Sequence, residues 1–235
     1  TDARAIFPCF DEPEFKATFR WIIRTDPGLE VITNGPLESR RKIKGKIVHR
    51  FRRTPVISSY LVAVAIGRFQ GTPPQRIVNV PCRIWCVPGK LDQTDFALEV
   101  TQWVLPWYQE YFAQKYRYLK LDQVAVPGFD AGAMENVGAV FYRQNLLLMQ
   151  PGATSWSAQK RIAEVVAHEL AHMWFGNLVT MRWWDDLWLN EAFATWLAYK
   201  AINLWKSEWR MWDDSLESIQ AALYADALVN THPVY

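Results

Sequence analysis

The spacing of apolar positions changes once along the chain, near residue 70. Before that point the apolar residues form short runs typical of β-strands, and turn sequences at residues 26–28 (Asp-Pro-Gly) and 34–36 (Asn-Gly-Pro) separate them. The run at residues 60–66 (YLVAVAI) is too short to span a bilayer and predicts a buried strand. Residues 71–74 (Gly-Thr-Pro-Pro) predict a domain junction, which divides the chain into residues 1–70 and 71–235.

Helical spacing dominates after the junction. One more strand is expected at residues 78–87, where Pro81 favours an edge position because proline cannot donate a ladder hydrogen bond. Apolar residues at positions 96–111 recur at helical spacing and predict a helix, which Pro106 should kink. Residues 124–142 then suit short strands and loops.

Three further helices are predicted in the last third of the chain. Ser155 or Ser157 can cap the first of them, and Gly176 can end it. The pair Asp185-Asp186 offers a cap for the second helix, and the third is expected at residues 207–227.

The composition is that of a globular protein. Half of the 235 residues are hydrophobic, which is enough to bury a sizeable core. The 26 basic and 24 acidic residues leave a net charge of +2, so charge gives no reason to expect nucleic acid or an anionic membrane as a partner. Nine of the thirteen tryptophans lie between Trp156 and Trp212. We expect most of these in the core and a minority in a substrate cleft.

The three cysteines do not form an obvious set. Cys82 and Cys86 alternate with other residues of the predicted strand, so both point to one face and are interpreted as small core residues. An odd number of cysteines without an expected disulfide suits a reducing compartment, which slightly favours the cytoplasm.

The candidate chemistry begins with residues 168–172 (His-Glu-Leu-Ala-His). Residues four apart on a helix are separated by about 6 Å of rise and about 40° of rotation, so the imidazoles of His168 and His172 can converge on one ion. Glu191 can supply the third protein ligand, which leaves a fourth position open, as in catalytic zinc sites. Glu169 can reach a water on that ion without being a ligand.

Other polar residues near the motif have two interpretations. Asp186 and Asn190 could orient the metal ligands through hydrogen bonds without contacting the ion. A role as helix caps or solvated polar residues is at least as plausible. Glu164, one turn before His168, is expected to be solvated. The competing interpretation of the motif itself is a pair of hydrogen-bonded histidines on a buried helix face, and Glu191 weighs against it.

A second constellation precedes the predicted metal helix: Gly132, Ala133, Met134, Glu135 and Asn136. With both constellations in view, the sequence resembles the M1 family of zinc aminopeptidases, the gluzincins related to aminopeptidase N. Matches in the family's order and spacing run from the first residue to His232-Pro233. The segments that carry the resemblance are residues 1–4 (TDAR), 7–13 (FPCFDEP), 132–136 (GAMEN), 168–180 (HELAHMWFGNLVT) and 183–191 (WWDDLWLNE).

The resemblance implies an α+β fold in two parts. Residues 1–70 would be the C-terminal part of a β-rich N-terminal domain, and residues 71–235 the first part of a thermolysin-like zinc catalytic domain. The chain is therefore expected to be an internal fragment of a longer protein.

The resemblance also implies a zinc-dependent peptide hydrolase. His168, His172 and Glu191 would hold one Zn²⁺ per chain. Zinc lowers the pKa of its bound water to about 7 and polarises the scissile carbonyl. Glu169 would act as the general base that takes the proton of this water.

The substrate implied by the resemblance is a peptide with a free N-terminus. Residues 132–136 would bind it, and Glu135 would hold its α-ammonium group. Gly132 and Ala133 would let the peptide backbone approach as a strand along an edge, and Met134 would form a wall of the first side-chain pocket.

Two family features have no counterpart in this sequence. Family members stabilise the oxyanion with a tyrosine whose matching position lies beyond Tyr235, so Tyr235 does not receive that role, and a second amine-holding residue would precede Thr1. Because losing one oxyanion donor typically costs about 10²–10³ in turnover, we expect the chain alone to be inactive or poorly folded.

Three other functions stay open from the residues. A zinc endopeptidase could use the same motif, although Glu135 argues against it. A peptide-binding relative that has lost catalysis would not need Glu169 and the three ligands intact. An epoxide hydrolase of the same fold would share these residues. The oligomeric state is left open by the sequence.

Overall fold

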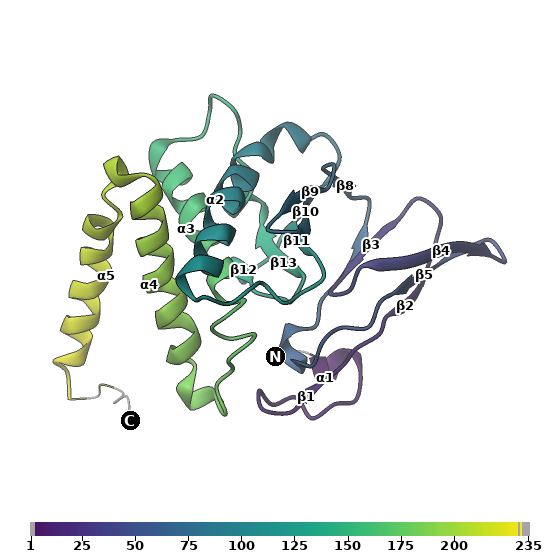
Figure 1. Cartoon of the computed structure of the whole chain (residues 1–235), viewed down its shortest axis with the longest axis horizontal. Helices are drawn as coiled ribbons and strands as arrows, with labels where there is room; N and C mark the ends of the chain where they lie inside the picture. The colour runs from purple at the N-terminus through teal and green to yellow at the C-terminus, as the bar shows by residue number, and fades with distance from the viewer. Residues whose placement is uncertain (1–2, 230, 232–235) are drawn as a thin grey trace.

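The computed structural model of the protein describes residues 3–229 and 231 and has the predicted α+β architecture (Figure 1). The first part of the chain consists mainly of short strands. Its elements are α1 (Ala3–Ile6), β1 (Lys16–Ala17), β2 (Ile22–Thr25), β3 (Glu30–Thr33), β4 (Leu37–Ile43), β5 (Lys46–Phe51), β6 (Ile57–Ser58), the 3₁₀ turn η1 (Ser59–Leu61) and β7 (Val64–Gly67).

The second part begins with strands and continues mostly as helices. The elements up to its last strand are β8 (Gln70–Gly71), β9 (Gln75–Ile77), β10 (Val80–Cys86), η2 (Leu91–Gln93), α2 (Asp95–Tyr111), β11 (Leu121–Val126), β12 (Ala133–Met134) and β13 (Ala139–Arg143). The remaining elements are η3 (Gln144–Leu146), α3 (Trp156–Ala171), η4 (Trp184–Asp186), α4 (Trp188–Trp205), η5 (Ser207–Trp209) and α5 (Met211–Asp226). β8 spans the boundary expected at residue 70, and that boundary stays a prediction.

The strands of the first part form small antiparallel sheets. β2, β5 and β4 make one sheet, while β3 pairs with β7 and β1 pairs with β6. In Figure 1 the β4–β5 hairpin reaches away from the rest of the molecule. Between these sheets and the second part lies a smaller apolar cluster that includes Ile32, Ala63 and Val124.

The prediction of one buried strand at residues 60–66 is wrong. The chain makes the η1 turn first and becomes a strand only at Val64. The reason is Asn34, whose buried side chain satisfies the backbone at this point. Its amide nitrogen donates to the carbonyl of Leu61 at 2.8 Å, and its oxygen accepts from the N–H of Ala63 at 2.9 Å. These side-chain bonds take the place of backbone hydrogen bonds to a neighbouring strand, so strand pairing stops at this point.

The second part is built on a mixed sheet in the order β12-β13-β11-β10-β8, with β9 also paired to β10. β10, β11 and β13 run parallel. β10 has β11 on one side and β8 and β9 on the other, so it lies inside the sheet and the predicted edge position of Pro81 is wrong. Pairing of β10 with β11 begins only at Cys82, and the missing N–H of Pro81 therefore costs no bond to β11. Cys82 and Cys86 are fully buried core residues with free thiols, as predicted.

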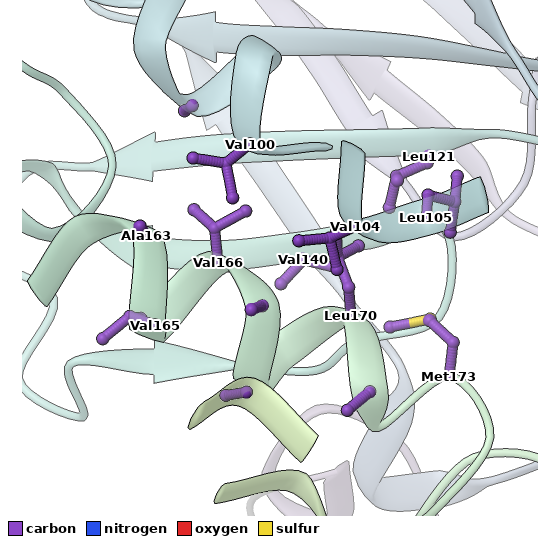
Figure 2. Packing of buried hydrophobic residues seen from close by; sticks show 14 of the residues in the cluster. Val100, Val104, Leu105, Leu121, Val140, Ala163, Val165, Val166, Leu170 and Met173 are labelled. Atoms are coloured by element: carbon purple, nitrogen blue, oxygen red, sulfur yellow. The ribbon is translucent and has the colours of Figure 1, made fainter. Parts of the chain in front are cut away.

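Helices α2 and α3 pack against this sheet and form the main core. Figure 2 shows Val100 and Val104 of α2 next to Val166 and Leu170 of α3, with Val140 of β13 close by. The five side chains are fully buried, and each such burial contributes about 1.5–3 kcal/mol relative to exposure. The core therefore fixes α3, the helix of the candidate metal motif, on the sheet.

The ends of the last helices differ in part from the predictions. Ser155 caps α3 as predicted, because its hydroxyl oxygen accepts from the N–H of Ala158 at 3.2 Å. However, α3 ends at Ala171, well before Gly176, because the backbone tightens into bonds such as Trp174 N–H to Ala171 C=O. The last predicted helix is interrupted at Arg210, which adopts a left-handed conformation with φ 50°.

The predicted cap of the second of these helices is also wrong. Leu187 occupies the N-cap of α4 and makes no side-chain cap bond. Asp185 and Asp186 instead belong to the turn η4, whose backbone runs directly into the helix. The helix thus begins by continuing a 3₁₀ turn and needs no side-chain acceptor at its start.

The tryptophans are less buried than predicted. Only Trp174 and Trp209 of the thirteen lie in the core, whereas Trp183, Trp188 and Trp196 are among those that are exposed. α4 is apolar on all sides, so packing one face on α3 leaves other aromatic side chains outside. None of the helices in the described ranges is long and apolar enough to cross a membrane.

Candidate metal centre and adjoining cavity

The three predicted metal ligands meet at one point. His168 lies in the last turn of α3, His172 is the residue that caps this helix, and Glu191 lies in the first turn of α4. The Nε2 atoms of His168 and His172 are 2.9 Å apart. The Oε2 atom of Glu191 is 3.3 Å from Nε2 of His168 and 3.7 Å from Nε2 of His172. Packing of α4 across α3 therefore brings the distant acid to the histidine pair.

These separations fit one small divalent ion. Ligand atoms at 2.0–2.1 Å around a tetrahedral zinc ion lie about 3.3 Å from one another. The three measured separations surround this value. Two imidazole nitrogens and one carboxylate oxygen are also ligand types that zinc accepts, and three ligands leave a fourth position open.

His172 presents an unprotonated nitrogen to this point. Its Nδ1 atom bonds to the carbonyl of Phe175 at 2.9 Å, and because a carbonyl only accepts, Nδ1 carries the proton. Burial lowers the pKa of His172, so its Nε2 keeps a free lone pair near neutral pH. The Nδ1 atom of His168 lies 3.3 Å from the hydroxyl of Thr195 on α4.

Glu191 is the charged member of the set. Its hydrogen bond with His168 lowers the pKa of its carboxyl group. Although the side chain is half-exposed, its inner oxygen faces both histidines. The carboxylate is therefore ionised near neutral pH and available as a ligand.

Glu169 is a buried carboxyl group beside the three ligands. It is 6% exposed, and its Oε2 atom is buried with no hydrogen-bond partner among the described residues. Burial first, and then the nearby carboxylates of Glu135 and Glu191, raise the pKa of Glu169 well above its usual value. An unpartnered oxygen of this kind is costly unless a water or a substrate group fills the place next to it.

Glu135 lies on the other side of the same point. It follows β12, which is an edge strand of the described sheet and pairs antiparallel with β13. Glu135 is 7% exposed, and ligand atoms of Glu135, Glu169 and His172 all lie within 4.8 Å of one another. Two carboxyl groups this close in a buried place favour a cation between them.

A cavity of about 390 Å³ opens over these groups. One side is lined by the segment from Ala131 to Glu135, and the other by α3 and the start of α4. Glu164 also lines it, is partly exposed and is ion-paired with the exposed Arg161 at 2.8 Å. One helical turn before His168, this side chain faces the cavity because it shares the inner face of α3.

The residues that support the ligands were only partly foreseen. Asn190 is buried next to the site, but its amide donates to the hydroxyl of Tyr60 at 3.4 Å instead of to a ligand. Asp186 makes no side-chain hydrogen bond within the described part of the chain. The two histidines bond instead to the carbonyl of Phe175 and to the hydroxyl of Thr195. Neither group could be recognised in the sequence, because every residue has a carbonyl and threonines are common in helices.

The motif residues at the N-terminus lie partly outside the described residues. Thr1 and Asp2 are not described, and neither are His232-Pro233 and Tyr235. Arg4 of the same motif donates from Nε to Asp11 at 3.3 Å, and Asp11 accepts from Ser59 at 2.6 Å. Arg4, Asp11 and Ser59 therefore stabilise the first part of the chain, and none of the three is hydrogen-bonded to the candidate ligands.

Comparison with known proteins gives a consistent result over the whole chain. The Peptidase M1 N-terminal domain matches residues 1–61, and the Peptidase family M1 domain matches residues 96–235. The second match covers the edge strand, both histidines and Glu191.

Curated relatives match over the full length of the chain. Aminopeptidase M1 of Arabidopsis thaliana is 43% identical over 99% of this chain and 26% of its own length. Leucyl aminopeptidase of Saccharolobus solfataricus is 42% identical over 100% of this chain and 30% of its own length. Puromycin-sensitive aminopeptidase of Caenorhabditis elegans is 43% identical over 100% of this chain and 25% of its own length. The chain thus spans between a quarter and a third of the length of these relatives.

Proposed function

The chain belongs to peptidase family M1, and from this premise we propose that the protein carrying it is a zinc-dependent aminopeptidase. The observation that supports this most is the closeness of Glu135 to the candidate base Glu169 and to His172, all within 4.8 Å. One extended residue spans about 3.3–3.6 Å. If the carbonyl of the bond to be cleaved lies at the three ligands, the peptide can extend by only one residue before it reaches Glu135. The group that meets Glu135 is therefore the α-ammonium group of the first residue.

His168, His172 and Glu191 are proposed to hold one zinc ion. The bound ion supplies Lewis acidity, which polarises a peptide carbonyl and acidifies water. Their donor atoms lie 2.9–3.7 Å apart, and the Nδ1 proton of His172 is held away from the ligand position by Phe175 C=O. His172 is thus set to offer its Nε2 lone pair without rearrangement.

Glu169 is proposed to move the proton. Its unpartnered Oε2 atom takes a proton from the attacking water and returns it to the nitrogen of the leaving amine. The raised pKa of Glu169 suits both steps. A carboxylate with a low pKa would be too weak a base to take the proton from water. A cation at the ligands would offset the repulsion from Glu135 and Glu191 and keep Glu169 ionised before the reaction.

Residues 132–136 are proposed to bind the peptide. β12 has β13 on one side only, so the peptide backbone can add as a further strand along its free edge. Gly132 has φ 88°, a left-handed conformation that favours glycine and turns the chain into this strand. Met134 lines the cavity and would form a wall of the first side-chain pocket, and Asn136 anchors the segment by donating to Val62 C=O at 3.3 Å.

The decisive experiment compares a peptide that has a free N-terminus with its acetylated twin. The whole gene product should release the first residue of the free peptide and leave the acetylated peptide intact. Equal cleavage of both peptides would favour a zinc endopeptidase instead. Zinc binding without cleavage of either peptide would favour a peptide-binding relative, and epoxide opening without peptide cleavage would favour an epoxide hydrolase.

We also propose that the 235-residue chain by itself turns over peptides poorly. α5 exposes large apolar residues such as Leu216, Leu223 and Tyr224, and such a surface disfavours a stable isolated monomer. The relatives are three to four times as long as the matched region. Robust aminopeptidase turnover by this chain alone would contradict the proposal.

A further inference from the structure

We propose that Tyr60, in the β-rich first part of the chain, is a positioning residue for the metal centre. Its hydroxyl group joins the turn that follows His172 to the helix turn that carries Glu191. The inference rests on the proposed function, since it concerns how the three candidate ligands are held. Tyr60 does not line the cavity and is not proposed to touch the substrate.

The first contact fixes the turn after His172. The hydroxyl of Tyr60 donates to the carbonyl of Gly176 at 3.0 Å. Gly176 directly follows Phe175, whose carbonyl holds the Nδ1 proton of His172 at 2.9 Å. A displacement of Gly176 would therefore move the acceptor that sets the tautomer and ring orientation of His172.

The space around Gly176 leaves little room for such a displacement. A Cβ atom at this position would lie 3.2 Å from Nδ1 of His172 and 3.3 Å from Nδ2 of Asn190. Its φ of 119° is also one that other residues rarely adopt. The backbone of Gly176 thus packs directly between His172 and Asn190, and its carbonyl accepts from the Tyr60 hydroxyl as well as from the Thr180 hydroxyl at 2.6 Å.

The second contact reaches the third ligand. Asn190 immediately precedes Glu191, and its side-chain amide donates to the Tyr60 oxygen at 3.4 Å. The same hydroxyl group therefore accepts from α4 and donates to the turn after α3. These are the two segments that must keep a constant separation if Glu191 is to stay near both histidines.

Tyr60 is itself rigidly held. It lies in the middle of η1, where the neighbouring Ser59 bonds to Asp11 and where Asn34 binds the carbonyl of Leu61. The ring packs edge-on against Trp184, with centroids 5.5 Å apart. Burial raises the pKa of Tyr60, so the hydroxyl keeps its proton and stays a donor to Gly176.

The alternative is that Tyr60 only stabilises the contact between the two parts of the chain. A purely structural tyrosine would lower stability by the same amount with and without metal. A positioning residue weakens metal binding specifically, and removal of a group that supports ligands typically costs about 10–100-fold in metal affinity. Zinc affinity therefore separates the two roles.

The test compares Tyr60→Phe with Tyr116→Phe in the whole gene product. Tyr116 is the matched control, because its buried hydroxyl also donates to a backbone carbonyl, that of Lys120 at 2.9 Å, in the loop before β11. Zinc dissociation constants are measured by competition with a chromophoric chelator, and thermal unfolding is followed for the metal-free proteins.

We expect zinc to bind Tyr60→Phe about tenfold or more weakly than wild type, and Tyr116→Phe within about twofold of wild type. The two metal-free variants should unfold at similar temperatures. Unchanged zinc affinity in Tyr60→Phe, or an equal loss in Tyr116→Phe, would overturn the proposal. If wild type itself binds no zinc at these residues, the proposed function fails instead, so the two failures are distinguishable.

A second variant covers the case in which Tyr60→Phe cannot be purified in folded form. Asn190→Ala removes the amide that donates to the Tyr60 hydroxyl and leaves the tyrosine in place. It should also weaken zinc binding in the chelator assay. Zinc affinity equal to that of wild type in Asn190→Ala would then count against the bridging role of the hydroxyl.

Discussion

The side-chain amide of Asn177 donates a hydrogen bond of 2.9 Å to the backbone carbonyl of Glu135. Asn177 belongs to the turn after His172, and Glu135 follows the edge strand on the opposite side of the cavity. The bond therefore fixes the proposed amine-binding carboxylate relative to the metal ligands. Asn34 adds a second anchor by donating to the carbonyl of Val137 at 2.8 Å.

Replacing Glu135 should strongly reduce the cleavage of peptides that have a free N-terminus. In Glu135→Gln the substrate ammonium loses its desolvated partner, a loss of about 2–5 kcal/mol that corresponds to about 30- to 5000-fold in kcat/KM for free-amine peptides. Steady-state kinetics with a series of unblocked dipeptides measures the effect. Asp130→Asn, in the exposed loop just before β12, is the charge-matched control and should leave kcat/KM nearly unchanged. An equally small effect of both substitutions would exclude the role given to Glu135.

Replacing Glu169 should separate metal binding from catalysis. Glu169→Gln keeps the size of the side chain but removes the base, so kcat should fall by about 10²–10⁴ while zinc content stays the same. Zinc is measured by plasma mass spectrometry on the same samples used for kinetics. The control is Glu99→Gln, on the exposed side of α2, which should change neither quantity. Full activity in Glu169→Gln with zinc bound would show that another group moves the proton.

The sequence was sufficient to predict that His168, His172 and Glu191 can come together, and their role as metal ligands stays a proposal. The spacing of His168 and His172 is a local property of a helix, and the structure places both rings together as that spacing requires. The position of Glu191 depends on how α4 crosses α3, which the spacing along one helix cannot determine. The sequence offered Glu191 as a third ligand, and the structure brings its carboxylate to 3.3 Å from Nε2 of His168.

The supporting contacts could not be predicted from the sequence. Tyr60 and Asn177 act through backbone carbonyls of residues that are distant or inconspicuous in the sequence, and such acceptors are the same at every position. The exposed tryptophans were misjudged because composition reports apolar content but not which faces of α4 are covered.

Asn34 should be important for stability. Its buried side chain bonds to Leu61, Ala63 and Val137, and Asn34→Ala leaves these backbone groups without partners. At about 1–3 kcal/mol for each buried group left unsatisfied, with partial relaxation, we expect a loss of about 2–5 kcal/mol in the free energy of unfolding. Urea denaturation of the whole gene product measures it. Asn145→Ala, at an exposed position of η3, is the control, and equal losses in the two variants would contradict the assigned role.

His49 should make the β-rich part sensitive to acid. Burial lowers the pKa of His49 below its ordinary value of 6.5, so between 6.5 and the lowered pKa the unfolded chain binds a proton that the folded chain does not. The free energy of unfolding should therefore fall as the pH drops through this window and level off below it. His172 is also buried, so the informative comparison is between wild type and His49→Gln.

Urea midpoints at several pH values between 7.5 and 5, with zinc present throughout, would give this comparison. The slope should be shallower in His49→Gln, because glutamine can still bond to Thr25 but does not titrate in this range. Identical slopes in the two proteins would mean that His49 contributes nothing to the acid sensitivity.

The most direct test of the central claim is an anomalous difference map at the zinc absorption edge, from crystals of the whole gene product. We predict one zinc peak per chain, within bonding distance of His168 Nε2, His172 Nε2 and a carboxylate oxygen of Glu191, with Glu169 beside the fourth position but not bonded to the ion. A map of zinc-loaded protein with no peak at these three side chains, or with the side chains pointing apart, would contradict the claim.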